Sequence, residues 1–275
     1  MTGEGEPATL ALLQGYVPNQ GDGWGYTVAY LQRFLETQRV DENHGAYLTL
    51  MQTLATRTAE LHRALATPSG DPAFEPEVFS AQDVEEWKRR VREEAEATLA
   101  MLERRAGEVE KTKLLLSARP RLFSLIEACA APRGKALKIR HHGDYHLGQV
   151  LLANNDFVII DFEGEPSRTL AEGRRKHSPL RDVAGMLRSF SYAKWSALMR
   201  AEAKPGTLDS WEAQTRQAFL AAYQQASGIS LDDVRGVLDL AELEKVLYEL
   251  RYELGNRPAW VQVPLEGVLG ILERK

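Results

Sequence analysis

The sequence has 275 residues and is 44% hydrophobic, which is enough for one large folded domain with a substantial core. Its 34 basic and 39 acidic residues are interspersed and leave a net charge of -5, so the composition argues against a nucleic-acid partner. Its single cysteine, Cys129, rules out an intrachain disulfide, and the lack of any apolar stretch of about 18 residues argues against a membrane partner and favours the cytosol.

The N-terminal half of the chain is predicted to consist mainly of helices. Residues 1–7 are rich in Gly and Glu, and a turn-forming stretch precedes a helical pattern that begins at Tyr26. Apolar residues recur every three or four positions over 48–65, which indicates an amphipathic helix. Prolines interrupt this helix over 68–76, and a long helix with a charged, solvated face is predicted from Ala81 to Lys113.

The middle of the chain changes to strand-forming patterns. Short strands are predicted over 137–139, 150–152 and 157–160, with Asn154-Asn155-Asp156 as a tight hairpin connection. Cys129 precedes them in an apolar run and is expected to be buried. The predicted helices that follow cover 182–193, 210–226, 231–235 and 240–254, with Pro258 and Pro264 ending the pattern. The expected fold class is therefore α+β and mostly α-helical.

The densest run of reactive side chains spans residues 141–149, between predicted strands, and is centred on Asp144. A second carboxylate, Asp161, directly follows an apolar strand, so we expect it at the edge of the core and partly shielded from water. Taken alone, Asp161 either caps the turn after the strand or binds Mg²⁺, which prefers one or two carboxylates together with phosphate oxygens.

The spacing of these motifs favours phosphoryl transfer. In the kinase catalytic loop H-R-D-x-x-x-x-N, an acidic residue and an amide lie five positions apart, as Asp144 and Gln149 do here. Asp161 follows Asp144 by 17 residues, across the predicted hairpin, and begins the sequence Asp-Phe-Glu-Gly, which is close to the D-F-G signature. A zinc site is disfavoured, because the sequence has neither His-Glu-x-x-His nor a Cys/His pair.

These motifs resemble those of the aminoglycoside- and choline-kinase superfamily, and within it most closely those of the maltokinases. The resemblance extends over essentially the whole chain. The matching segments are His142–Leu151, Asp161–Pro166, Ser178–Ser189, Ala8–Leu13, Gly21–Trp24, Tyr248–Glu253 and Asn256–Pro258.

The resemblance implies a fold, a donor and an acceptor. The fold is the C-terminal lobe of a protein-kinase-like structure, in which a small β-hairpin carries the catalytic and metal loops. ATP is the implied phosphoryl donor, Mg²⁺ the implied cofactor, and maltose the implied acceptor. The product is maltose 1-phosphate, on a route from trehalose to glycogen or another α-glucan.

The resemblance also implies roles for individual residues of the two loops. Asp144 is expected to receive or orient the proton of the sugar hydroxyl. Gln149 and Asp161 are expected to bind Mg²⁺, with Glu163 as a further ligand. Gln149 departs from the Asn of the wider superfamily, so its distance to the metal is less well defined. His146 is expected to face the substrate.

Further residues are expected to support the loop or to contact the sugar. His142 is expected to pack beneath the loop, and Asp182 to brace it through backbone amides. The expected sugar-binding residues near the C-terminus are Tyr248, Glu249, Tyr252 and Glu253. At helical spacing the glutamates share one face and the tyrosines another, so one pair lines the acceptor cleft while the other is buried. The sequence leaves open which pair does so.

A kinase of this fold also needs a β-rich N-terminal lobe, with a loop over the phosphates and a Lys paired to a helix Glu, and neither precedes the helices. Residues 1–7 are therefore expected to be a flexible remnant of the interlobe hinge, and 8–275 the kinase-like C-terminal lobe. The expected partners are the absent N-terminal lobe and, by fusion or in a complex, a trehalose synthase. Whether the chain is a fragment, a separately encoded half or part of a fusion stays open.

Two other functions stay open as well. A kinase with the same chemistry could act on another small hydroxyl acceptor, such as an aminoglycoside, choline or a different sugar. Alternatively, the chain could be a catalytically silent module that binds sugar or docks onto a synthase, a hypothesis that the absent lobe favours.

Overall fold

The computed structural model describes residues 13–37, 44–105, 111–133, 136–164 and 169–273, and most of them are helical. The expected hinge at residues 1–7 lies outside the described residues. The helices are α1 (Gly23–Thr37), α2 (Gly45–Leu65), α3 (Ala81–Glu103), α4 (Thr112–Ser117), α5 (Arg119–Glu127), α6 (Leu170–Gly173), α7 (Leu180–Arg200), α8 (Asp209–Ser227), α9 (Arg235–Asn256) and α10 (Gln262–Glu273), with short 3₁₀ turns η1 (Leu147–Gln149) and η2 (Pro258–Trp260).

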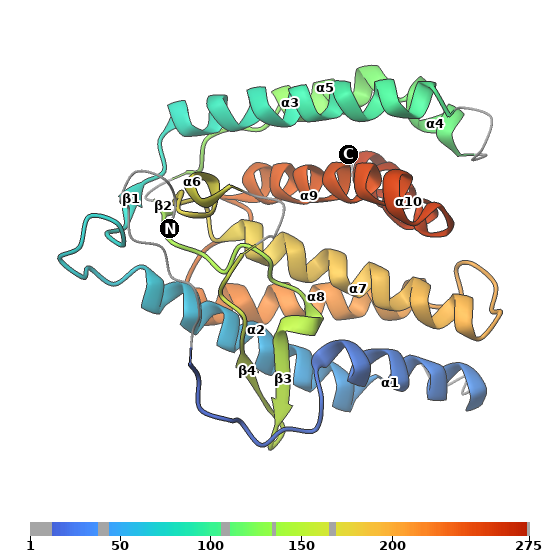
Figure 1. Cartoon of the computed structure of the whole chain (residues 1–275), viewed down its shortest axis with the longest axis horizontal. Coiled ribbons are helices and arrows are strands. Elements are labelled where there is room, and N and C mark those ends of the chain that lie inside the picture. Colours follow the sequence, from blue (N-terminus) through green and yellow to red (C-terminus); the bar gives the residue numbers. More distant parts are fainter. Residues whose placement is uncertain (1–12, 38–43, 106–110, 134–135, 165–168, 274–275) are drawn as a thin grey trace.

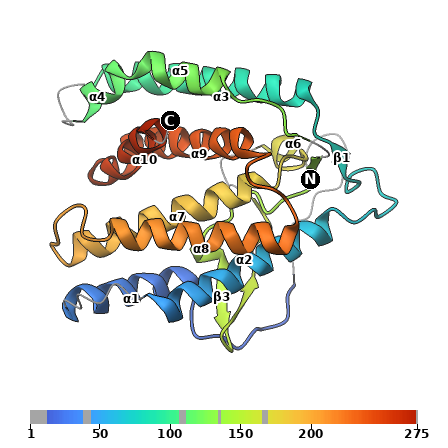
Figure 2. The same ribbon diagram turned by 180° about the vertical axis from the view of Figure 1, so that it is seen from behind.

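The helices are stacked in layers. Figure 1 shows α3, α4 and α5 on one side, α9 and α10 next, then α7 and α8, with α1 and α2 on the opposite side. The view from behind in Figure 2 shows the same order. The packing agrees with both views, because α2 lies along α8, and α7 contacts α1, α8 and α9. α7 is therefore the central helix of the molecule.

α7 is buried along nearly its whole length, including two basic residues. Arg188 is paired with Glu249 of α9 at 2.9 Å, and Lys194 with Glu212 of α8 at 2.6 Å. A buried charge without a partner would cost several kcal/mol, so these ion pairs are what allow a charged sequence to occupy the centre of the fold. No helix among the described residues is both long and apolar enough to cross a membrane.

α3 begins where the sequence predicts and ends earlier. Ser80 and Asp83 form a capping box at its first turn, which satisfies amide donors that have no partner within the helix. The prediction that this helix continues to Lys113 is wrong: it ends at Glu103, and α4 and α5 pack back against it. Gly107, a poor helix former, lies between α3 and α4 in the sequence, outside the described residues.

The strands form two small antiparallel sheets. β3 (Val150–Ala153) pairs with β4 (Asp156–Ile159) as a hairpin, and β1 (Glu77–Val78), which the sequence analysis missed, pairs with β2 (Leu137–Lys138). Arg57 of α2 contacts both carboxylate oxygens of Asp156, at 2.8 and 2.7 Å, and so ties the β3–β4 hairpin to the helical layer.

The C-terminal region differs from prediction in two places. The expected helix over 231–235 is a turn in which only Arg235 is helical, as the first residue of α9. The prediction that the helical pattern ends at Pro264 is wrong. This proline lies in the first turn of α10, where a missing amide donor costs nothing. Cys129 is buried as expected, and its thiol donates a hydrogen bond to the Gly236 carbonyl at 3.2 Å.

Candidate functional site

Two loops that follow β2 and β4 meet beside the N-terminal end of α7. Gly143 has a φ of +87°, and a side-chain Cβ at this position would lie 3.4 Å from the Cα of Gly164. His142 bridges the loops, because its Nε2 donates to the Ile160 carbonyl at 2.8 Å and its ring packs against Phe162. The loop around Asp144 and the loop after Ile160 are thereby held together through His142.

Asp182, near the start of α7, holds the first of these loops from below. Its carboxylate is buried and accepts hydrogen bonds from the amides of His142 at 2.8 Å and Gly143 at 3.0 Å. It also accepts one from His62 Nε2 at 3.1 Å, and Tyr223 in turn donates to His62 Nδ1 at 2.9 Å. These contacts connect the loop to α2 and α8.

The environment of Asp182 keeps it ionised. Burial alone would raise its pKa, but the His62 hydrogen bond, the charges of His141 and His62 and the Gly143 amide together lower the pKa well below its ordinary value. An ionised carboxylate accepts stronger hydrogen bonds from backbone amides than a neutral group does. Asp182 is therefore a charged anchor for the loop, as the sequence analysis expects.

Asp144 lies half-buried between three basic groups. His146 Nε2 is 3.7 Å from one of its oxygens, and Lys245 Nζ of α9 is 3.6 Å from the other. His146 Nδ1 accepts the Gly148 amide at 3.0 Å, which leaves the ring proton on Nε2, facing Asp144. Burial raises the pKa of Asp144, and His146, Lys245 and His142 more than offset this, so the pKa is lowered overall.

Gln149 and Asp161 lie side by side at the ends of the hairpin. Gln149 Nε2 donates to Asp161 Oδ2 at 2.7 Å. Asp161 has a φ of +64° and is exposed, so the expectation that the core partly shields it is wrong. Asp161 lies two residues beyond the end of β4, in a left-handed backbone conformation, and is not part of the strand. Glu163 is also exposed, and among the described residues no hydrogen bond or ion pair joins it to Asp161 or Gln149.

The donor set at this position fits a hard cation that keeps part of its water shell. Within the described part of the chain, no three His, Cys, Asp or Glu side chains gather closely enough to hold a metal by themselves. The adjacent amide and carboxylate of Gln149 and Asp161 offer two oxygens once the amide turns over, and Mg²⁺ ordinarily completes its shell with water and phosphate oxygens.

The expected sugar-binding residues of α9 divide between its two faces. Glu249 pairs with Arg188, and Glu253 accepts hydrogen bonds from Tyr192 and Arg257, so both glutamates are buried in ion-pair networks. Both carboxylates therefore have partners within the protein.

The tyrosines of α9 occupy its other face. The rings of Tyr248 and Tyr252 stack with centroids 6.4 Å apart, and Tyr252 is 44% exposed. Lys245 Nζ lies 5.2 Å from the centre of the Tyr248 ring, which places this tyrosine next to the group that contacts Asp144. The tyrosine pair is thus the accessible one, a choice that the sequence left open.

Sequence reasoning missed two residues of this site, Lys245 and His62. Lys245 precedes Tyr248 by three positions and so shares its helix face, a spacing that could have drawn attention to it. His62 lies next to Leu61 within the predicted helix over 48–65, and no local pattern marks it as a site residue. The cavity that borders Gly143, Lys245 and Tyr248 measures about 50 Å³, which holds water but no sugar.

Comparison with known proteins identifies relatives of the whole described fold. A family model described as the phosphotransferase enzyme family matches residues 3–238. A glucosamine kinase from Streptacidiphilus jiangxiensis is 30% identical over 264 residues, which cover 94% of this chain and 57% of that protein. A glucosamine kinase from Mycolicibacterium smegmatis is 28% identical over 274 residues, which cover 97% of this chain and 64% of that protein.

Solved structures of glucosamine kinase have a similar fold. A complex with glucosamine, ADP and inorganic phosphate superposes with a TM-score of 0.76 and 25% identity, over 94% of this chain and 62% of that one. Crystal form A gives a TM-score of 0.77 and 26% identity, over 94% and 61% respectively. The chain therefore spans less than two thirds of the length of these relatives.

Proposed function

Because the chain belongs to the phosphotransferase enzyme family, we propose that it forms the acceptor- and metal-binding part of an ATP-dependent sugar kinase. The observation that carries this proposal is the junction of the two loops. His142 joins the Asp144 loop to the loop that begins with Asp161, and Asp182 ties the junction to the central helix. Phosphoryl transfer needs one carboxylate beside the attacking hydroxyl and another beside the metal and phosphates.

In this proposal the side chains divide the work of the transfer. The sugar hydroxyl oxygen bonds to the γ-phosphorus as the bond to the ADP oxygen breaks, and the hydroxyl proton passes to Asp144. The lowered pKa of Asp144 keeps the carboxylate ionised, so it can accept a hydrogen bond from the sugar hydroxyl and orient it. Gln149 and Asp161 would hold Mg²⁺, with Glu163 as a further ligand through water. When bound, this ion would neutralise charge on the phosphates.

For the acceptor, we propose a monosaccharide or disaccharide lying against the tyrosine face of α9. The relatives are named for glucosamine, so glucosamine is the first acceptor to test, and maltose, which the sequence motifs favour, is the second. Tyr248 and Tyr252 offer aromatic surface for a sugar ring. Glu249 and Glu253 are bound in ion pairs, and we assign them to support of that face. His146, beside Asp144, would contact the reacting hydroxyl.

The wider setting of the enzyme is also part of the proposal. Residues 8–275 would act as the C-terminal lobe, with a β-rich N-terminal lobe covering ATP, and the cytosol is the proposed compartment. A role in α-glucan synthesis, with trehalose synthase as a partner, rests on the maltokinase resemblance alone. Maltose turnover would favour that setting, whereas turnover of glucosamine would argue against it.

The test is ADP release from ATP and Mg²⁺ with glucosamine or maltose. The assay uses the chain alone and the chain mixed with the N-terminal portion of a glucosamine kinase, because the relatives are longer than this chain. Turnover that disappears on chelation of Mg²⁺ and in Asp144→Asn would support the kinase. Calorimetric binding of sugar without turnover in either mixture would instead favour the silent sugar-binding module.

A further inference from the structure

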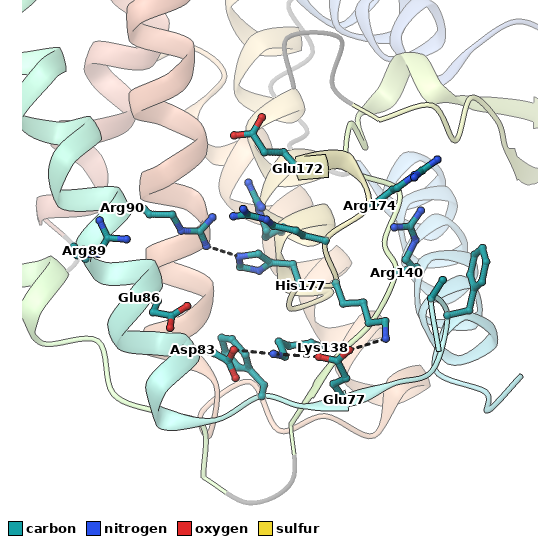
Figure 3. A pocket seen from close by; sticks show the side chains of 16 residues that line it. Glu77, Asp83, Glu86, Arg89, Arg90, Lys138, Arg140, Glu172, Arg174 and His177 are labelled. Carbon is teal, nitrogen blue, oxygen red and sulfur yellow. Dashed lines mark hydrogen bonds and ion pairs between the residues drawn. The ribbon is translucent and has the colours of Figure 1, made fainter. Parts of the chain in front are cut away.

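A cavity of about 860 Å³ lies between the start of α3, the β1–β2 sheet and the segment after α6. Figure 3 shows Arg90 of α3 turned towards His177, with Arg140 and Arg174 near each other on the other side of that histidine. We call this cavity the arginine pocket and define it by Arg90, Arg140, Arg174 and Arg175. Its volume falls within the range of about 300–1,000 Å³ that is typical of small-molecule sites.

Among the residues that the structure describes, acidic side chains balance only part of the positive charge of the pocket lining. The lining contains twice as many basic as acidic residues. Arg90 lies 3.3 Å from His177 Nε2, a contact that supplies no carboxylate to balance its charge. Neither Arg140 nor Arg175 forms an ion pair with a carboxylate in the portion of the chain that the structure describes.

Arg140 is the residue of the pocket that most clearly favours a bound anion. Burial lowers its pKa, and the nearby charge of Arg174 lowers it further. The guanidinium carbon of Arg140 lies over the Phe74 ring, 5.4 Å from the ring centre, and this contact supplies no negative charge. Bringing guanidinium groups together in a half-buried place costs free energy, and a bound anion would offset that cost.

We propose that the arginine pocket binds a small phosphomonoester anion, such as a sugar phosphate. Guanidinium groups present parallel N–H donors that match phosphate oxygens in a bidentate geometry, and several arginines from different elements can surround one phosphate. The remaining volume, beside Phe74, accommodates a sugar-sized group. Inorganic phosphate shares this chemistry, so the test below separates the two sources.

This site is distinct from the candidate active site. A lining with this charge suits neither an amino sugar nor Mg²⁺, both of which are cationic. Asp144, Gln149 and Asp161 are not among the residues that line the pocket. The inference therefore stands whether or not the chain is a kinase.

The experiment is isothermal titration of the chain with glucose 6-phosphate and, separately, with inorganic phosphate, at constant ionic strength set by NaCl. Arg140→Gln and Arg175→Gln are each expected to weaken binding by about tenfold or more, the loss of one charge-assisted hydrogen bond. The matched control is Arg33→Gln, an exposed arginine of α1 far from the pocket, which should bind both probes as the parent does.

The two probes identify the ligand, and the variants decide the proposal. Tighter binding of glucose 6-phosphate than of phosphate indicates a monoester site, and equal binding indicates a site for the phosphate group alone. The proposal is overturned if neither probe binds the folded parent, or if the pocket variants bind as tightly as Arg33→Gln. Circular dichroism checks folding, and Arg175→Gln, on an exposed side chain, decides the matter if Arg140→Gln misfolds.

Discussion

Asp182 shows how a single buried carboxylate fixes a loop to which it does not belong. Its two oxygens accept two backbone amides of the Asp144 loop and one imidazole N–H from α2. A neutral side chain of this size, such as Asn, does not offer two acceptor oxygens. The conformation of the loop therefore depends on the charge of Asp182 as well as on its shape.

Asp182→Asn is expected to destabilise the protein at neutral pH by about 3 kcal/mol, because an amide NH₂ would then face a backbone N–H inside the core. Urea unfolding measures this loss. The folded pKa of Asp182 is below its ordinary value of 3.8, so its stabilisation is complete above pH 3.8 and disappears as the pH falls through that lower folded pKa. The gap between parent and variant should close only in that acid range, and a gap that closes near pH 6 would contradict this account.

Asp144→Asn should separate catalysis from stability. We expect turnover to fall by roughly 10²–10⁴, the usual contribution of a proton acceptor, while the free energy of unfolding changes little because the side chain is only half-buried. Steady-state kinetics on the assembled enzyme provide the measurement. Asp232→Asn, at an exposed position in the turn before α9, is the matched control and should leave both quantities unchanged.

At the scale of elements, α7 and the Asp144 loop approach so closely that only glycine fits between them. A Cβ on Gly185 would lie 2.5 Å from the Tyr145 carbonyl oxygen. Gly185→Ala is therefore expected to destabilise the fold by about 2 kcal/mol and to reduce turnover by displacing the loop. Thermal unfolding measures this loss of stability. In the same experiment, Gly255→Ala in α9, where a Cβ meets nothing within 4 Å, should be neutral or stabilising.

In the turn of the β3–β4 hairpin, one substitution is expected to raise the stability of the protein. Asn154 and Asn155 have φ values of +54° and +59°, the geometry of a two-residue turn in which glycine is favoured at the second position. Asn155→Gly should therefore stabilise the protein by about 0.5 kcal/mol, measured by chemical denaturation. Asn155→Ala is the contrasting variant and should be destabilising, and a loss of stability in the glycine variant would show that the Asn155 side chain has a separate role.

Local sequence signals predict these elements well where an element depends on neighbouring residues. They predict them poorly where an element depends on contacts with distant parts of the chain. The Asn-Asn turn indicates the β3–β4 hairpin, and the Ser80 cap indicates the start of α3. In α2, the apolar pattern includes Leu61, whereas the buried face turns towards Thr58 and His62, which contact the loop region. β1 has two residues and exists only because it pairs with β2 from far along the chain, so no local pattern could reveal it.

At the scale of the whole molecule, helices α8 and α2 support the candidate site through hydrogen bonds that lead to Asp182. Tyr223 of α8 and His62 of α2 form a hydrogen-bonded line that ends at Asp182. His62→Leu should destabilise the fold by about 3 kcal/mol, because Asp182 loses its imidazole donor while it stays buried. Tyr223→Phe removes only the outer hydroxyl and should cost about 1 kcal/mol.

The same pair of variants tests whether this line positions the loop. Turnover measured on folded enzyme should fall by roughly tenfold or more in His62→Leu, since a small displacement of the reacting groups is costly. It should change little in Tyr223→Phe. Equal turnover in parent and His62→Leu would limit the role of His62 to stability.

Long-range contacts also limit what the sequence reveals of the site. The proximity of Asp144, Gln149 and Asp161 follows from a loop and a hairpin, so their spacing could predict it. His62 meets Asp182 across 120 residues, and nothing near either residue signals that contact. The burial of Glu249 likewise depends on Arg188 in another helix, which explains why helical periodicity could not choose between the glutamates and the tyrosines.

Cys129 gives the molecule a built-in reporter of local opening. Its thiol is the only one in the sequence, and it lies buried after α5, donating to the first turn of α9. A thiol-reactive dye can modify this sulfur only when those two elements separate. The rate of labelling in native conditions therefore measures how often the α5–α9 contact breaks, and it does so without any engineered probe.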